Sequence, residues 1–237
     1  MNAMIDVHAH VLPGVDDGAK DMEESVQMLL KLASLGFAGV IATPHYYRRR
    51  EFYGMEELVS ELQQRVREYQ PDFSIYLGQE TYYHDELTAR LRQGKAYTMA
   101  GSRYVLVEFD PGVPYSMLYQ GIRKLSGAGY DPILAHIERY ECLRKSNHLK
   151  ELSSAHCLLQ MNYESLQGKW FDREVRWCRR QVEQGVIGLL GSDMHRMDYR
   201  PPEFGEALKW LEQHISPEYL DQLTRCNPLR IINQGKH

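Results

Sequence analysis

Short apolar segments alternate along the chain with longer segments in which apolar residues recur every three or four positions. The short segments are typical of buried strands, and the recurring spacing is typical of amphipathic helices. Strands are therefore predicted over residues 4–10, 39–43, 73–77, 104–109, 132–135, 158–162 and 186–190. Helices are predicted between the N-cap Asp21 and Gly36, and over residues 55–69, 85–93, 115–128, 172–184, 203–214 and 217–225. This regular alternation predicts parallel strands joined by helices.

The number of predicted strands favours a closed barrel. About seven strands in a chain of 237 residues suit a barrel better than an open sheet. The chain shows no internal repeat, linker or low-complexity segment, and α/β barrels of this size are commonly undivided. We therefore expect residues 1–237 to form a single α/β domain.

Composition narrows the classes of function. A formal net charge of −4 gives no overall attraction to nucleic acid or to anionic membranes. No apolar run approaches the roughly 20 residues needed to span a bilayer. The first four residues do not resemble a signal peptide. A cytoplasmic protein is expected, with no nucleic-acid partner and no membrane insertion.

The cysteines exclude one kind of phosphatase chemistry. They are scattered and form no CxxC pair, so neither disulfides nor a structural zinc site is expected. A cysteine phosphatase needs an arginine six positions after its nucleophile, where it closes the phosphate-binding loop. The residues at that offset from the four cysteines are His148, Tyr163, Gln184 and Ile232. Catalysis by a cysteine nucleophile is therefore not expected.

Histidines and acidic residues follow the predicted strands. His8 and His10 lie in the first strand, about 7 Å apart along one face, and two such imidazoles can converge on one cation. Other candidates fall at or near the ends of later segments: His45, Glu80, Glu108, His136, Asp193 and His195. The pair Asp16-Asp17 follows the first strand before the first helix. Parallel barrels carry their chemistry at the carboxyl ends of the strands, and buried ionisable groups are costly unless paired or metal-bound. The set predicts a multinuclear metal site.

Mixed histidine and carboxylate ligands without a thiolate suit Zn²⁺, Mn²⁺ or Fe. A carboxylate that bridges two such cations is typical of sites that generate a hydroxide nucleophile near neutral pH. Asp6 shares the strand face of His8 and His10, so it is a candidate to orient an imidazole. The alternative for Asp6 is a surface position on the strand.

The motifs together resemble the polymerase-and-histidinol-phosphatase (PHP) superfamily. They are Asp6-x-His8-x-His10, Thr43-x-His45, Gly78-x-Glu80, His136 to Tyr140, and Ser192-Asp193-x-His195. Further motifs are similar to the bacterial manganese-dependent protein-tyrosine phosphatases of capsule and exopolysaccharide operons. These are Val15 to Gly18, Ser102 to Tyr104, Glu108-Phe109, Arg200 to Pro202 and Asn227-Pro228. The resemblance covers essentially the whole chain.

The resemblance implies a distorted, TIM-barrel-like (β/α)₇ barrel of the PHP type with three divalent metal ions. Manganese is the expected metal, with iron or zinc as alternatives. By motif position, the first metal is expected at His8, His10, Glu80 and Asp193. Glu80 is expected to bridge to a second metal held by Glu108 and His136, and a third is expected at Asp17, His45 and His195.

The resemblance also implies the reaction and the substrate. Arg139 and Arg200 are expected to bind phosphate, and Asp193 and His195 join them as candidate catalytic residues. The hypothesis is hydrolysis of a phosphomonoester by metal-activated hydroxide, without a phosphoenzyme. The implied partner is the phosphotyrosine tail of a bacterial tyrosine kinase in capsular or extracellular polysaccharide synthesis.

Three alternatives stay open at this point. They are a small-molecule phosphatase of the histidinol-phosphate type, an amidohydrolase, and a non-enzymatic binding module. The run Arg48 to Arg50, just after His45, is a candidate to steer an acidic peptide toward the site, or else a solvated loop.

Overall fold

The computed structural model describes residues 4–46, 54–145 and 147–235, and its named strands pair in parallel in two sheets. One sheet has the order β1 (Met4–Ala9), β2 (Phe37–Ala42) and β4 (Ser74–Leu77). The other has the order β3 (His45–Tyr46), β5 (Glu80–Tyr82), β6 (Tyr104–Glu108), β7 (Asp131–Leu134), β8 (Leu158–Asn162) and β9 (Leu189–Gly191). The sheet order follows the chain order, as in a barrel of βα units.

The two sheets are joined into one ring. β2 and β3 form one strand interrupted at Pro44, and the Glu80 amide that begins β5 donates to the Pro44 carbonyl at 3.1 Å. At the other edge, the His10 amide donates to the Met194 carbonyl at 2.9 Å, which joins the end of β1 to the segment after β9. The expected distorted (β/α)₇ barrel is thereby confirmed.

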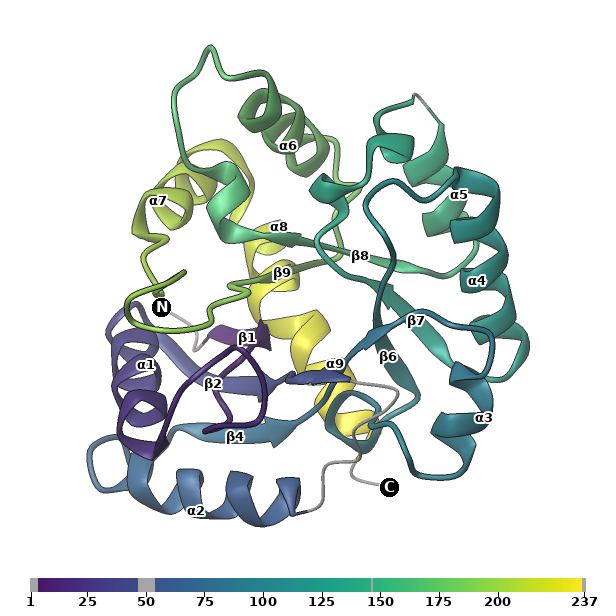
Figure 1. Cartoon of the computed structure of the whole chain (residues 1–237). Coiled ribbons are helices and arrows are strands. Elements are labelled where there is room, and N and C mark those ends of the chain that lie inside the picture. The colour runs from purple at the N-terminus through teal and green to yellow at the C-terminus, as the bar shows by residue number, and fades with distance from the viewer. Residues whose placement is uncertain (1–3, 47–53, 146, 236–237) are drawn as a thin grey trace.

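The α-helices are α1 (Met22–Ser34), α2 (Met55–Arg67), α3 (Leu87–Arg92), α4 (Tyr115–Gly127), α5 (His148–Ser154), α6 (Arg173–Glu183), α7 (Gly205–His214), α8 (Pro217–Asp221) and α9 (Asn227–Gln234). Helices α1 to α7 lie around the outside of the strands, whereas α8 and α9 cross the middle of the view (Figure 1). Short 3₁₀ turns are η1 (Met99–Gly101), η2 (Ile137–Arg139), η3 (Glu141–Arg144) and η4 (Tyr163–Leu166). The predicted N-cap is confirmed, since the Glu24 amide donates to Asp21 Oδ1 at 2.9 Å.

An apolar cluster fills the inside of the barrel and includes α9. Side chains from several strands take part, among them Val7 of β1, Leu106 of β6 and Leu189 of β9. Ile231 and Ile232 of α9 join them and are fully buried, so α9 closes the amino-terminal end of the barrel. Burying each such side chain stabilises the fold by roughly 1.5–3 kcal/mol.

The end of the chain differs from the sequence prediction. A single helix was predicted over residues 217–225, but α8 runs into a π-helical turn, η5 (Gln222–Cys226), and then into α9. Pro228 reads as a helix breaker, yet it occupies the first turn of α9, where the amide hydrogen it lacks has no intrahelical acceptor. The wide π turn accommodates this restart.

One further boundary and one further helix differ from the prediction. β9 begins at Leu189, because the Val186 amide donates to the Gln181 carbonyl and so ends α6. The short helix α5 was not predicted. Within the described ranges, no helix is both long and apolar enough to cross a membrane.

Candidate metal centre

The structure brings all nine predicted ligands together at the carboxyl end of the barrel. They are His8, His10, Asp17, His45, Glu80, Glu108, His136, Asp193 and His195. His10, Glu108, His136 and Asp193 lie at the end of a strand or within two residues of it, whereas His45 and Glu80 begin the short strands β3 and β5. Strand ends that meet at one rim are how the barrel gathers residues that are far apart in the sequence. Six of them are fully or almost fully buried.

The group of residues expected at the first metal consists of two histidines and two carboxylates. Ligand atoms of His8, His10 and Asp193 all lie within 4.8 Å of one another. Glu80 approaches both imidazoles, with Oε1 3.4 Å from His8 Nε2 and Oε2 3.4 Å from His10 Nε2. This grouping matches the four residues expected at the first metal.

Glu80 also approaches the second expected group. His136 Nε2 lies 2.8 Å from Glu80 Oε1 and 3.5 Å from Glu108 Oε2. The structure adds His45, whose Nδ1 lies 3.0 Å from Glu80 Oε2 and 3.7 Å from Glu108 Oε1. Glu80 is therefore shared between the groups, as a bridging carboxylate must be.

The third expected group is also assembled. Asp17 Oδ1 lies 3.5 Å from His45 Nε2 and 3.7 Å from His195 Nε2. His10 belongs to the same set of atoms within 4.8 Å of one another, so it lies between the first and third groups. The three groups form one continuous cluster.

Hydrogen bonds behind the rings fix which nitrogen faces the cluster. His8 Nδ1 lies 3.1 Å from Gln160 Oε1, and His10 Nδ1 lies 2.7 Å from Asp16 Oδ2. His195 Nδ1 lies 2.8 Å from the Asp193 carbonyl oxygen. Each acceptor fixes a proton on Nδ1, so Nε2 is the nitrogen that faces the centre and offers its lone pair there when the ring is neutral.

Asp16, Gln160 and Asn162 are functional residues that the sequence analysis missed. Asp16 Oδ2 also accepts from the His45 amide at 2.8 Å, so it positions two ligands. Gln160 Nε2 donates to Asn162 Oδ1, and Asn162 Nδ2 donates to Asp193 Oδ2, each at 2.9 Å. The available signal was the pair of polar residues two positions apart at the end of an otherwise apolar strand.

The predicted role of Asp6 is wrong. Its carboxylate does not hold an imidazole and is not on the surface; it is fully buried. It accepts from the Ser192 amide at 2.9 Å, from the Ser192 hydroxyl and from the His8 amide at 3.2 Å. Burial is the main cause that raises the pKa of Asp6 to about 6. Asp6 therefore fixes the backbone on both sides of the site.

Backbone conformation is unusual at the site. His136, Asp193 and Arg200 have φ angles of 32°, 52° and 53°, a left-handed region that ordinary residues rarely adopt. Close packing adds a second constraint, because a Cβ at Gly18 would lie 2.1 Å from the His10 carbonyl oxygen and one at Gly191 would lie 2.6 Å from His8 Cβ. Such strain is typical of functional sites.

Both candidate phosphate-binding arginines reach the cluster. Arg200 Nη1 lies 3.2 Å from Asp193 Oδ2, and Arg139 Nη2 contacts the same oxygen. Their side chains are about one third exposed, 32% for Arg139 and 31% for Arg200. Two guanidinium groups at the solvent side of the cluster suit a phosphate dianion, because they stay charged and donate in a fixed geometry.

The charges in the cluster depend on one another. Burial opposes ionisation of Glu80, but the nearby His8 charge and hydrogen bonds from His10 and His136 hold its pKa well below the usual range. Burial also opposes a charged His136, yet Glu108 and Glu80 raise its pKa to about 9. For His195, burial and the His10 charge lower the pKa to about 4. The carboxylates thus require positive charge within the cluster.

The donor atoms fit divalent metal ions. His8 Nε2 and His10 Nε2 lie 3.3 Å apart and both face inward, so with neutral rings two lone pairs meet there and favour a positive charge between them. Asp193 Oδ1 is buried and accepts no hydrogen bond from the described residues, although three imidazole nitrogens lie within 3.6 Å. A buried carboxylate oxygen that lies beside inward-facing imidazole nitrogens is what a metal site requires.

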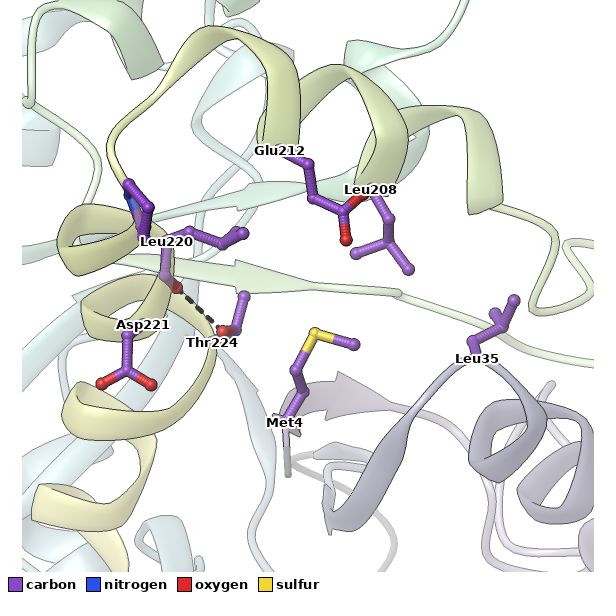
Figure 2. A pocket seen from close by; sticks show the side chains of 8 residues that line it. Met4, Leu35, Leu208, Glu212, Leu220, Asp221 and Thr224 are labelled. Carbon is purple, nitrogen blue, oxygen red and sulfur yellow. Dashed lines mark hydrogen bonds between the residues drawn. The ribbon is translucent and has the colours of Figure 1, made fainter. Parts of the chain in front are cut away.

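Two further regions are the arginine run noted in the sequence and a hollow away from the metal-ligand cluster. The run Arg48 to Arg50 lies outside the described residues. A hollow of about 310 Å³ lies at the opposite end of the barrel, beside Met4 at the start of β1 (Figure 2). Leu35, Leu208 and Leu220 line it together with the carboxylates of Glu212 and Asp221. It contains no histidine, so it has no part in the cluster.

Fold and site define a metallohydrolase of the parallel barrel class. Residues 4–233 match the model of a family described as capsular polysaccharide synthesis, CpsB/CapC. The chain belongs to this family. It is 31% identical to tyrosine-protein phosphatase CpsB of Streptococcus pneumoniae over 97% of this chain and 98% of that protein. It is 29% identical to tyrosine-protein phosphatase YwqE of Bacillus subtilis, over 98% of this chain and 92% of that protein.

Solved structures agree with this assignment. Crystal structures of YwqE from Bacillus subtilis and CpsB from Streptococcus pneumoniae, described as metal-dependent tyrosine phosphatases, include a chain that matches with a TM-score of 0.86. The match has 26% identity and covers 98% of this chain and 95% of that one. The phosphotriesterase homology protein of Escherichia coli matches with a TM-score of 0.62 at 14% identity, covering 97% and 98% of the two chains, and shows the barrel fold alone.

Proposed function

We propose that the chain is a metal-dependent protein-tyrosine phosphatase that hydrolyses the phosphomonoester of phosphotyrosine. The observation that carries the proposal is the convergence of two guanidinium groups and a histidine–carboxylate cluster on Asp193. A site of this kind combines a place for the phosphate dianion with a place for divalent metals. The names of the relatives support the choice of phosphotyrosine as substrate.

The ligand assignment is part of the proposal. His8, His10, Glu80 and Asp193 would hold one metal, Glu80, Glu108 and His136 a second, and Asp17, His45 and His195 a third. Manganese is the proposed metal. When bound, such ions lower the pKa of water and neutralise phosphoryl oxygens.

The chain itself binds and orients the substrate. Arg139 and Arg200 would hold the phosphate between the solvent and Asp193, and their attachment to one carboxylate keeps the two guanidinium groups side by side. His195 has a pKa lowered to about 4, so it is neutral at working pH and suited to be a ligand rather than a proton donor. Tyrosinate, with a parent pKa near 10, needs less help from an acid than an alkoxide does.

The proposed partner is the phosphotyrosine tail of a bacterial tyrosine kinase in polysaccharide synthesis. The description of the matching family supports this setting. A cytoplasmic location is proposed as well, and it agrees with the four free thiols. The proposal treats residues 1–237 as one domain.

The decisive experiment measures phosphate release from a phosphotyrosine peptide with Mn²⁺, for the native chain and for His136→Ala. Removal of this ligand should lower the rate by about a hundredfold or more, because the metal position proposed at Glu80, Glu108 and His136 loses one of its donor atoms. His214→Ala is the matched control, because His214 lies on α7 and, among the described residues, its ring bonds to the Trp210 carbonyl of its own helix and to no residue of the cluster. Its rate should equal that of the native chain.

Parallel assays separate the alternatives. Faster turnover of histidinol phosphate than of phosphotyrosine peptides would assign the chain to the small-molecule phosphatases. Hydrolysis of a lactone or amide without phosphate release would assign it to the amidohydrolases. A native chain that binds phosphopeptide under saturating Mn²⁺ and leaves it intact would be a binding module.

A further inference from the structure

A second hollow, which we call the α5–α6 hollow, lies between η3, the start of α5 and the second half of α6. Its volume is about 280 Å³. The lining residues that matter here are Arg144, Lys145, Lys150, Trp177, Arg180 and Gln184. The hollow is separate from the metal-ligand cluster, and the proposed function does not use it.

The α5–α6 hollow has a strong positive charge. Four of its lining side chains are cationic and none is acidic, in a chain whose formal net charge is −4. Arg144 pairs with Glu174, whereas Lys145, Lys150 and Arg180 pair with no acidic side chain among the residues that the structure describes. Cations gathered around a concave surface repel one another and focus a positive potential, which an anion relieves.

One wall of the hollow is aromatic. Trp177 is half-buried on α6, and the Arg144 guanidinium lies over its ring, 4.0 Å from the ring centroid. Buried leucines, Leu143 and Leu149, line the hollow as well. An anion that also carries an aromatic ring can use both kinds of surface, since the ring packs on apolar groups and the guanidinium.

The α5–α6 hollow is connected to the metal cluster through a short segment. Arg144 Nη2 donates to the Glu138 carbonyl at 2.7 Å, and Glu138 lies between His136 and Arg139 in the sequence. Arg139 and Arg144 are five residues apart, so their Cα atoms are separated by at most about 18 Å. An extended peptide of about six residues covers that distance.

We propose that the α5–α6 hollow binds a second phosphotyrosine side chain of the same peptide whose first phosphotyrosine occupies the metal cluster. This inference rests on the proposed function. Arg180, Lys145 and Lys150 bind the phosphate, and Trp177 packs against the ring. A second contact within one chain raises the effective concentration of the first group at its site, so it lowers KM for doubly phosphorylated peptides. A concave, partly aromatic surface suits one side chain better than a flat membrane.

The test compares two peptides on three proteins. The peptides carry either one phosphotyrosine or two, with the two separated by about six residues. The proteins are the native chain, Lys150→Glu/Arg180→Glu, and the control Arg65→Glu/Arg67→Glu. The control makes the same change in net charge on exposed residues in the last turn of α2, as Arg180 is in the last turn of α6.

The native chain and the control should show a KM at least about tenfold lower for the doubly phosphorylated peptide. Lys150→Glu/Arg180→Glu should lose this preference, with kcat and the kinetics of the singly phosphorylated peptide unchanged. Replacement of the second phosphotyrosine by glutamate should remove most of the preference. Thermal unfolding checks the fold of each variant, and Lys150→Gln/Arg180→Gln replaces the reversed pair if that pair is unstable.

The inference is overturned if Lys150→Glu/Arg180→Glu keeps the native preference. It is also overturned if that variant loses only binding to phosphatidylserine vesicles, which would make the hollow a membrane contact. Failure of the proposed function is recognised separately. The binding of peptides with non-hydrolysable phosphonate groups is measured by fluorescence anisotropy. This measurement tests the α5–α6 hollow even if the protein releases no phosphate.

Discussion

The two ends of the barrel are built in opposite ways. At the carboxyl end, carboxylates and imidazoles are buried together, and three residues of the site have left-handed backbone angles. At the amino-terminal end, α9 places Ile231 and Ile232 in an apolar cluster. Buried charge and strain therefore lie at the end that carries the chemistry, and ordinary packing supplies stability at the other.

The contrast has a physical reason. A buried carboxylate such as Asp193 is costly unless something positive lies beside it, so the carboxyl end is complete only with cations present. An apolar side chain such as Ile232 is stabilised by burial alone. Changes at the carboxyl end should therefore act on metal binding and turnover, and changes at the amino-terminal end should act on the free energy of unfolding.

The largest effect should come from removing the metals. A chelator should abolish phosphate release and lower the unfolding temperature, since metals bind only the folded cluster. Iodoacetamide near neutral pH should leave activity unchanged, because burial raises the pKa of Cys157 and Cys178 to about 12, and because neither Cys142 nor the exposed Cys226 belongs to the metal-ligand cluster. The reactive thiolate becomes populated only as the pH rises toward that value. Inactivation by iodoacetamide together with resistance to chelation would contradict the assignment.

A smaller loss is expected when a residue behind a ligand is removed. Asp16→Ala leaves His10 Nδ1 and the His45 amide without their acceptor, so the His10 ring loses its fixed orientation and the backbone at His45 loses a hydrogen bond. Metal affinity, measured by calorimetric titration, should fall by about 10–100-fold. Asp72→Ala, at an exposed position beyond α2, is the control. Equal affinities for the two variants would show that Asp16 does not orient the ligands.

Asp16 also shows where sequence reasoning stops. Eight of the nine proposed ligands could be singled out from the sequence, because HxH spacing and predicted strand ends are local features and the barrel gathers strand ends at one rim. Asp17 was expected only from the family resemblance. The acceptors behind them were not. Gln160 contacts His8 across a separation of 152 residues, and such a partner depends on the packing of β8 beside the cluster. Asp6 was misassigned for the same reason, since its partner Ser192 is 186 residues away.

The fold shows the same division. Most helices and strands were predictable from hydrophobic spacing, and the N-cap Asp21 from local chemistry. The restart of the last helix at Pro228 was not, because a tertiary contact overrides the local signal for a break. Ile231 and Ile232 obtain their burial from the inside of the barrel, and this burial stabilises α9, whose first turn tolerates the proline.

That argument predicts the effect of truncating α9. Ile232→Ala should lower the free energy of unfolding by about 2–5 kcal/mol, because it leaves a cavity inside the barrel. Phosphate release per folded molecule should stay at the native value, since the metal cluster lies at the other end. Arg230→Ala, on the exposed side of α9, should change the free energy of unfolding by no more than about 0.5 kcal/mol. Chemical denaturation with activity measured in parallel checks both results.

The smallest effect is expected at the hollow in Figure 2, and it tests whether the two ends are independent. Leu208 is only partly buried there, so Leu208→Ala should cost less than a fully buried leucine, about 2 kcal/mol or less. Met4 beside the hollow and His10 at the cluster are separated by about 20 Å along an extended strand.

Two substitutions that lie so far apart and share no contacting residue should have additive effects on the free energy of unfolding. The unfolding free energies of Leu208→Ala, Asp16→Ala and the double variant, measured without metal, should be additive within about 0.5 kcal/mol. Metal affinity should respond to Asp16→Ala alone. A coupling clearly above 0.5 kcal/mol would mean that β1 and α9 transmit changes between the ends, and the separation of stability from chemistry would then have to be abandoned.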